Sequence, residues 1–466
     1  MKGTITLLIL CFLWVIPSVP ASSPGVIRLE LTVFPPEAEV TVIPPESYRG
    51  GPVVSSPIRS TSGIGTLRRV YPALPPATRL RITAPGYEEA MVHLPGGAGD
   101  SGVISIEERL FPAGGPLRLS AELPTGDGPK SVAFVPGGRI VVPLLWDTGA
   151  DTFQLTVDRL EQVSVEPIGR IQPPPEIAGE EGFVEPLCIA AHGELWISQM
   201  NGDRLHRFDL VDMNYRESIS AAGQWPKVMA VVPPTAFRPT GPVVESAWNP
   251  NRQPSARGTG GKDRALLVTS NWLSETVVFH DRATGELVHD VHLEGQPRGI
   301  AVFDDPREVW VTEFSTGDIV VIEPYSGAIV DRLPLGPGAA RHIVAHPRDR
   351  RVYYSDMYHG TVSVIDGDTR EVRLTRRFGS NINTIAVDPR GRYLYISERG
   401  RNNPESYHLP GPAFGRIFVV DADTLEPVQT VWGRHQPTGL AVSPDGTLLA
   451  ATDFLDDNMS IYTVAE

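Results

Sequence analysis

The chain has 466 residues, 41% of them hydrophobic and 21% charged, which is enough for two domains with ordinary hydrophobic cores. Its 45 glycines and 45 prolines argue against a helical protein and favour many short strands joined by turns. Its formal net charge of −14 would repel phosphate backbones, so we expect no nucleic-acid partner.

Residues 1–21 are predicted to be a signal peptide. Lys2 is their only charge, the segment from Ile5 to Ile16 is apolar, and Val19-Pro20-Ala21 matches a signal-peptidase site. The apolar run is shorter than the roughly 20 residues that span a bilayer, so we expect cleavage and no membrane span afterwards. The mature protein is therefore expected outside the cytoplasm, in the periplasm, on the cell surface or secreted. Cys188 is the only cysteine beyond this segment, so no intramolecular disulfide can form.

Residues 22–111 are predicted to form a small β-sandwich, because residues 25–43 and 78–94 alternate apolar and polar side chains as half-buried strands do. Two short segments, Pro36–Val40 (PEAEV) and Ala84–Tyr87 (APGY), resemble the PEGA-type extracytoplasmic module. An immunoglobulin-like assignment fits this region about equally well. Residues 112–116, rich in proline and glycine, are the predicted linker.

Residues 117–466 contain a repeat of about 42 residues. In residues 295–336, four short apolar runs rich in valine and isoleucine are separated by turn-forming clusters, which predicts a four-stranded antiparallel meander. Seven such units can be counted from the turn before each innermost strand. We therefore predict an all-β protein in which a seven-bladed β-propeller follows the small β-sandwich.

The last unit has only three predicted strands, and the segment Pro116–Pro124 stands alone before the first. We expect this segment to complete the seventh blade and close the ring. Three units carry insertions, near residues 171–182, at Arg238–Lys262 and at Gly400–Gly415. By propeller connectivity the first and third lie on the face where the innermost strands begin, here called the decorated face, and such loops often bind ligands.

The ends of several predicted second strands, WVTE, YYSD, YISE and AATD, resemble the YVTN repeat of secreted seven-bladed propellers. The order of the two domains is similar to that of spirochaetal surface antigens. This resemblance implies an exported binding protein without catalysis. Some propellers with similar repeats open sugar lactones, so a lactonase-like hydrolase with a polar or metal-containing site is the alternative.

Two rings of residues are expected near the central channel. The ends of the second strands form the first ring: Gln199, Ser270, Glu313, Asp356, Glu398 and Asp453, with Leu144 as the closest match in the first blade. The residues after each entry turn form the second ring: Lys130, Leu187, Lys227, Arg298, Arg341, Asn383 and Thr438. The residues that follow the first ring are expected to pack between blades: Met200, Asn271, Phe314, Met357, Arg399 and Phe454.

Two interpretations of the rings stay open. The functional one is a charged funnel for a small polar or anionic ligand, or for a divalent cation held by the carboxylates, although no cofactor is evident. The structural one is a rim of ion pairs, such as Arg298 with Glu313 and Arg341 with Asp356, which contribute about 0–1 kcal/mol each when exposed.

A loop in the sixth blade is the predicted partner-binding segment. It gathers donors, acceptors and an aromatic ring: Arg399, Arg401, Asn402, Asn403, Glu405, Tyr407 and His408. The alternative is an ordered turn whose asparagines bond their own backbone. Common catalytic motifs such as GxSxG and HExxH are absent from the sequence, so no catalytic residue is predicted. His342, beside the second ring, is kept as a possible acid or base. The function expected is binding of a protein or small polar ligand on the decorated face, with oligomeric state open.

Overall fold

The computed structural model describes residues 27–46, 58–61, 67–75, 77–94, 103–158, 162–234, 264–305 and 307–465. The predicted signal peptide and the predicted insertion at Arg238–Lys262 lie outside these residues. The chain divides into two compact units, Met1–Leu110 and Phe111–Glu466. Within the described ranges, no helix is both long enough and apolar enough to cross a membrane.

The first unit is a β-sandwich. One sheet has the order β3 (Ile58–Thr61), β4 (Leu67–Leu74), β1 (Ile27–Phe34), β7 (Val103–Arg109). The other has the order β2 (Glu39–Ile43), β5 (Arg79–Thr83), β6 (Ala90–His93). Alternate residues of β1 are buried, and side chains from both sheets share one apolar core, as the alternating sequence predicts. The Ala84–Tyr87 segment forms the turn between β5 and β6, where Gly86 has a φ of 80°.

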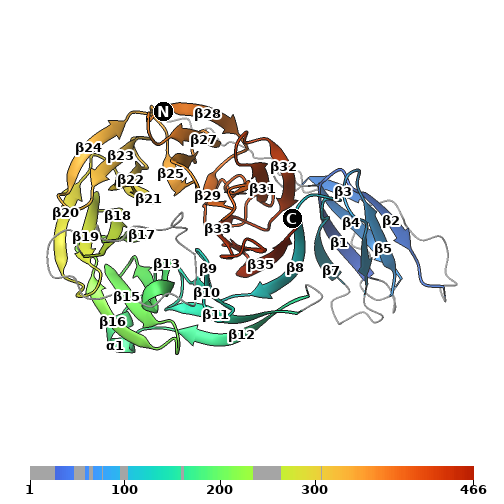
Figure 1. Ribbon diagram of the computed structural model, residues 1–466. Coiled ribbons are helices and arrows are strands. Elements are labelled where there is room, and N and C mark those ends of the chain that lie inside the picture. Colours follow the sequence, from blue (N-terminus) through green and yellow to red (C-terminus); the bar gives the residue numbers. More distant parts are fainter. Residues whose placement is uncertain are drawn as a thin grey trace, which may run out of the picture. The chain divides into compact units, whose positions relative to one another are not determined.

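The second unit is a seven-bladed β-propeller, in which the described residues form seven four-stranded sheets around a common axis (Figure 1). Blade 1 comprises β9 (Ala133–Val135), β10 (Arg139–Pro143), β11 (Ala150–Val157) and β12 (Val163–Ile171). Blade 2 comprises β13 (Phe183–Ile189), β14 (Glu194–Gln199), β15 (Arg204–Asp209) and β16 (Tyr215–Ser220). Blade 3 comprises β17 (Pro226–Val232), β18 (Leu266–Asn271), β19 (Thr276–Asp281) and β20 (Leu287–His292).

Blade 4 comprises β21 (Pro297–Asp304), β22 (Arg307–Glu313), β23 (Ile319–Glu323) and β24 (Ala328–Leu333). Blade 5 comprises β25 (Ala340–Ala345), β26 (Arg351–Asp356), β27 (Thr361–Asp366) and β28 (Val372–Arg377). Blade 6 comprises β29 (Ile382–Val387), β30 (Tyr393–Glu398), β31 (Arg416–Asp421) and β32 (Pro427–Trp432). Two short helices, α1 (Pro175–Ala178) and η1 (Ala190–His192), flank β13.

Blade 7 closes the ring with strands from both ends of the propeller. It comprises β33 (Pro437–Val442), β34 (Leu448–Asp453), β35 (Asn458–Val464) and β8 (Leu117–Pro124). The antiparallel pairing of β35 with β8 confirms the predicted closure and can be followed in Figure 1, where β8 lies beside β35. Closure gives blade 7 its fourth strand and joins both ends of the propeller in one sheet.

The innermost strands approach one another closely around the axis. A Cβ on Gly299 in β21 would lie 2.8 Å from the backbone nitrogen of Ile343 in β25, too near for any other residue without a shift. Large aromatic side chains such as Trp196 and Trp310 are fully buried farther out along the sheets. The inner strands therefore form a closely packed ring of backbone around the axis. The side chains of the decorated face project from this ring.

Two neighbouring-blade contacts repeat around the ring. In blade 2 the Glu194 carboxylate accepts hydrogen bonds from Trp196 Nε1 at 3.0 Å and from Arg282 Nη1 of blade 3 at 2.5 Å. In blade 4 the Glu308 carboxylate accepts from Trp310 Nε1 at 3.0 Å and from Arg370 Nη2 of blade 5 at 2.6 Å. The sequence Glu-x-Trp thus marks a buried carboxylate that joins one blade to the next.

Candidate functional site

The strand register corrects the first predicted ring at one position. Opposite the first residue of each inner strand lie Gln199, Asn271, Glu313, Asp356, Glu398 and Asp453. Asn271, and not Ser270, is therefore the blade 3 member, because it pairs with Pro226, the first residue of β17. In blade 1 a single bridge pairs Pro129 with Leu144, the residue that the sequence comparison favoured.

The carboxylates of this ring bond the loops that enter their own blades. Glu313 is fully buried and accepts hydrogen bonds from the backbone nitrogens of Glu294 at 2.9 Å and Gly295 at 3.2 Å, and it pairs with Arg332. Equivalent backbone donors are Ala339 to Asp356 at 3.3 Å, Ser380 to Glu398 at 2.9 Å and Arg434 to Asp453 at 2.8 Å. The first ring thus has a local structural role in each blade.

The predicted pairs Arg298–Glu313 and Arg341–Asp356 are wrong. Glu313 pairs with Arg332 of its own blade, and Asp356 lies 3.1 Å from His359 Nδ1. Glu398 likewise pairs with Arg416 at 2.5 Å. These partners come from the third and fourth strands and the turns between strands, away from the second ring, because the carboxylates turn toward the loops that they bond.

Exchanging Glu313 for glutamine should destabilise the propeller by about 1–3 kcal/mol, because the amide offers one acceptor oxygen to four donors and leaves the guanidinium of Arg332 without its counter-charge. Urea unfolding followed by tryptophan fluorescence measures the change. Glu294→Gln is the control, since its side chain is 76% exposed and its contact with Arg332 is 3.6 Å long. A Glu313→Gln protein as stable as the wild type would contradict the structural role.

The second ring gathers cations at the axis. Lys130, Lys227, Arg298 and Arg341 occupy equivalent positions, and Val184 rather than Leu187 takes the place in blade 2. Sequence comparison missed this because Phe183, three residues before Pro186, is the residue opposite Gln199. Asn383 and Thr438 complete the ring and are buried.

Arg399, which follows the first ring in blade 6, joins these cations. The positive charges of the other four side chains all act on Lys130 and lower its pKa, so the five side chains form one group. The four are Arg399, Arg341, Lys227 and Arg298. We call Lys130, Lys227, Arg298, Arg341 and Arg399 the axial cation cluster. Arg298 is 4% and Arg341 and Arg399 are each 8% exposed, whereas the two lysines are half-buried.

Glu185 is the carboxylate that contacts this cluster. Its Oε1 lies 2.9 Å from Arg298 Nη2. Among the residues that the structure describes, no carboxylate pairs with Lys130, Lys227, Arg341 or Arg399. Glu185 and His342 occupy the same position in blades 2 and 5, two residues into the inner strand, which places both beside the cations. Glu185 directly precedes Pro186 in the sequence. Because Pro186 was taken as the entry residue of blade 2, Glu185 was placed outside the second ring.

Burial and mutual repulsion disturb the titration of the cluster. Burial and the neighbouring cations hold the pKa values of Lys130, Lys227 and Arg341 well below their usual ranges. Burial lowers the pKa of Arg399 to about 10 and, with Arg298 and Arg341 opposing Glu185, that of His342 to about 4. His342 is therefore a neutral imidazole at pH 7.

Among the described residues, two buried donor atoms in the cluster have no hydrogen-bond acceptor. They are Arg298 Nη1 and Arg399 Nε. A buried polar atom without a partner costs free energy, so a native structure rarely keeps several side by side without a reason. Excess positive charge and unpartnered donors together describe a site built for a negatively charged group.

Aromatic side chains surround the cations on the decorated face. The residues after the first ring were expected to pack between blades, but Phe314, Met357, Met200 and the corrected member Trp272 are half-buried. Phe454 is fully buried and lies beneath Lys130, whose Nζ is 4.3 Å from its ring centroid. The sequence prediction pointed the acids of the first ring toward the axis, so the residues that follow those acids were expected between the blades. Phe454 instead lies against Lys130 of the cation cluster.

The blade 6 loop divides into a structural part and an exposed part. Asn403 donates to Pro410 O at 2.9 Å and accepts from the Glu405 backbone at 2.9 Å, so it bonds its own loop. Arg401 and Asn402 are exposed, with Asn402 Oδ1 3.4 Å from Asn381 Nδ2. The rings of Tyr407 and His408 stack at 3.8 Å, and both side chains are exposed.

This loop is tied to the axis through one glutamine. Gln436 donates to Tyr407 O at 2.6 Å, and its side-chain oxygen accepts from Arg399. Arg399 also lies 5.9 Å from the Tyr407 ring centroid. The exposed rings of the loop are therefore connected to the cation cluster through Gln436 and Arg399.

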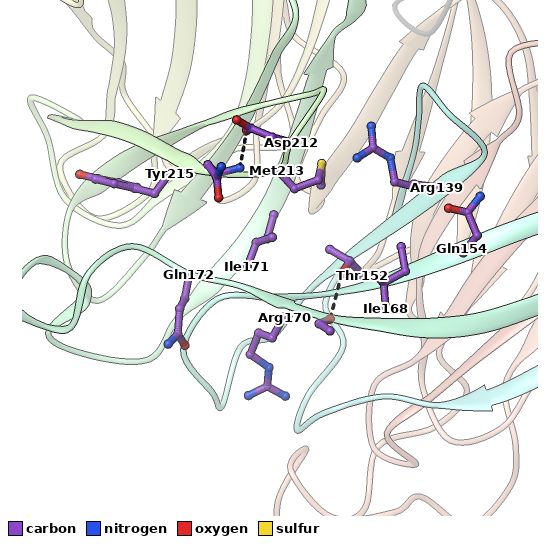
Figure 2. A pocket seen from close by; sticks show the side chains of 12 residues that line it. Arg139, Thr152, Gln154, Ile168, Arg170, Ile171, Gln172, Asp212, Met213 and Tyr215 are labelled. Atoms are coloured by element: carbon purple, nitrogen blue, oxygen red, sulfur yellow. Dashed lines mark hydrogen bonds between the residues drawn. The ribbon is translucent and has the colours of Figure 1, made fainter.

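A separate hollow of about 560 Å³ lies between blade 1 and the turn that joins β15 to β16 (Figure 2). Its charged side chains are already paired, since Arg170 contacts Asp151 at 2.8 Å and Asp212 contacts Arg216 at 3.3 Å. Arg139 bonds the carbonyl of Pro136 at 3.0 Å. This satisfied surface is a weaker binding candidate than the unsatisfied axial cluster.

Metal-binding groups are sparse in the part of the chain that the structure describes. There, no three His, Cys, Asp or Glu side chains come together in a way that could hold a metal ion. His346 lies four residues after His342 and pairs with Asp349 at 2.8 Å. Burial raises the pKa of the Cys188 thiol to about 12, so it stays protonated and unreactive.

Comparison with known proteins gives two matches. The model of the Lactonase family, described as a seven-bladed β-propeller, matches residues 328–466. Antigen Lp49 of Leptospira interrogans serogroup Icterohaemorrhagiae serovar copenhageni is 31% identical over 354 residues, which cover 74% of this chain and 69% of the antigen.

Proposed function

The chain belongs to the β-propeller family of antigen Lp49, and from this premise we propose that it is an exported binding protein that holds an anionic ligand at the axis of its propeller. The observation that carries the proposal is the axial cation cluster, in which five basic side chains meet one carboxylate, Glu185. The antigen's name and the predicted signal peptide support export. The N-terminal unit, which resembles a PEGA or immunoglobulin-like module, would serve as a spacer or a second contact.

The acidity of the whole protein sharpens this argument. With a net charge of −14, the chain does not attract anions in general, so a local excess of cations acts only on a ligand that reaches the axis. The chain has four lysines, and two of them, Lys130 and Lys227, lie in the cluster. Half of the lysines therefore lie at the axis, where a compact ammonium could meet an anionic ligand.

Titration of the mature protein with tricarballylate, an aliphatic trianion, is expected to show saturable binding that weakens as salt is added. A ligand that binds only the folded state at a hundred times its dissociation constant adds about 2.7 kcal/mol to stability, which thermal melting detects. The trication spermidine is the matched control and should give no shift. If neither the heat of binding in calorimetric titration nor a shift in thermal melting is seen with any anion tried, the proposal is wrong.

A lactonase-like hydrolase is the second candidate, favoured by the family match over residues 328–466. Neutral His342 would take a proton from water as the water oxygen attacks the lactone carbonyl, and Arg298 would stabilise the oxyanion. The ring C–O bond then breaks, and the proton passes to the leaving oxygen. Gluconolactone opening, followed by acid release, reports this reaction. Turnover that His342→Gln abolishes would replace the first proposal.

A further inference from the structure

The charges of the site indicate how many charges its ligand carries. One carboxylate, Glu185, opposes five cations, and its ion pair with Arg298 leaves the other four without an ion-pair partner among the described residues. A singly charged anion would neutralise little of this excess. A ligand with two or three negative charges would offset most of it and satisfy the unpartnered Arg298 and Arg399 donors.

Aromatic rings flank the cluster on one side through Lys130. Its Nζ lies 4.3 Å from the Phe454 ring centroid, and the tilted rings of Phe454 and Trp146 have centroids 4.5 Å apart. Trp146 in turn meets His408 of the blade 6 loop at 5.4 Å. Because Trp146 is half-buried while Phe454 is covered, Trp146 is the ring that a ligand held by Lys130 would touch.

A second set of rings flanks the cluster through Lys227. Its Nζ lies 5.4 Å from the Trp225 ring centroid and 5.9 Å from that of Trp272. Trp272 packs on Phe314 at 4.8 Å, and both are half-buried. Each lysine of the cluster is therefore bordered by large aromatic faces rather than by carboxylates.

The backbone at Trp225 is unusual for a residue of its size. Trp225 has a φ of 57°, and the same loop position holds Gly128 and Gly182 in other blades. A bulky side chain in the left-handed region is strained, and such strain persists where the surroundings impose it. Trp225 is nonetheless 37% exposed, so burial of its own ring does not account for its place.

Building on the proposed function, we infer that the ligand is a multiply charged anion with a flat aromatic body, whose acid groups meet the axial cation cluster while its ring stacks on Trp146 or Trp272. Two observations carry this: the surplus of cations without carboxylates, and the part-exposed aromatic rings that contact the same lysines. Stacking favours a planar ring over an aliphatic chain of equal charge. Aromatic di- and tricarboxylates and aryl phosphates belong to this class.

Isothermal titration with two trianions tests the inference. Benzene-1,3,5-tricarboxylate and tricarballylate carry the same three carboxylates on an aromatic ring and on an aliphatic chain. We expect the aromatic acid to bind at least tenfold more tightly. In the double variant Trp146→Leu/Trp272→Leu this preference should disappear, while the affinity for tricarballylate should stay the same. Unchanged binding of tricarballylate also shows that the variant is folded.

The outcomes separate the two proposals. Equal affinity of the wild type for both acids would overturn the aromatic inference and leave anion binding standing. An aromatic preference that survives the double variant would also overturn it, because the rings named here would not be in contact with the ligand. Binding of neither acid would overturn the proposed function together with the inference drawn from it.

Discussion

Lys130→Met is expected to lower the affinity for tricarballylate at least tenfold and to stabilise the free protein. The ammonium of Lys130 is surrounded by four other cations and packs on Phe454. Desolvation and the four neighbouring cations disfavour the charged ammonium, so an apolar side chain of similar length should raise the free energy of unfolding. Methionine also packs well against an aromatic ring.

The control for this variant is Arg377→Met, which removes one positive charge from an exposed position of β28. Both are measured by calorimetric titration and by urea unfolding. All tryptophans after residue 21 belong to the propeller sequence, so fluorescence reports this unit separately from the sandwich. A Lys130→Met protein that binds anions like the wild type, or that loses stability, would show that Lys130 is a structural side chain.

The same residue makes stability depend on pH. Burial and nearby cations lower the pKa of folded Lys130 well below its usual 10.5, whereas the unfolded chain keeps the usual value. Between these two pKa values the unfolded state binds more protons, so the free energy of unfolding rises with pH across that window. Below the lowered pKa the full penalty remains. Lys130→Met should make the free energy of unfolding depend less steeply on pH, whereas Arg377→Met should not. Because the pKa of Lys227 is lowered in the same way, part of the slope should remain in Lys130→Met.

The fold was accessible from the sequence because it depends on patterns that repeat. Valine-rich runs, turn clusters and the unpaired segment before the first blade predicted four-stranded sheets and the pairing of β35 with β8. Each of these follows from alternation and turn chemistry within about 42 residues, and seven copies reinforce one another. A local error in one blade therefore did not disturb the architecture.

The site was only partly accessible, since its chemistry depends on single-residue register. The prediction named Ser270 where Asn271 pairs with the first residue of its inner strand, and Leu187 where Val184 follows that first residue, because one sequence does not fix the alignment of divergent blades to a single residue. Glu185 was missed for the same reason. The side-chain direction of Glu313 depends on backbone donors in a neighbouring loop, which no sequence period reveals.

Glu308→Ala is expected to destabilise the propeller by about 3–5 kcal/mol, the cost of removing one partner from a buried ionic group. The carboxylate is 6% exposed and accepts from Trp310 at 3.0 Å, from Arg370 at 2.6 Å and from Arg350 at 3.2 Å. Its loss leaves an indole N–H without an acceptor and weakens the junction between blades 4 and 5. Urea unfolding followed by tryptophan fluorescence measures the effect.

Glu426→Ala is the matched control, because it removes a two-point contact with Arg376 on a side chain that is 62% exposed, and should cost no more than about 1 kcal/mol. Equal losses in the two variants would mean that burial adds nothing to the Glu308 contact. The double variant Glu308→Ala/Arg370→Ala should lose less than the sum of the single changes, because the second removes a cation that the first has deprived of one of its two carboxylate partners. Since Glu194 and Arg282 repeat the arrangement, Glu194→Ala should show the same coupling with Arg282→Ala. Such coupling in both places would establish that charged contacts join neighbouring blades.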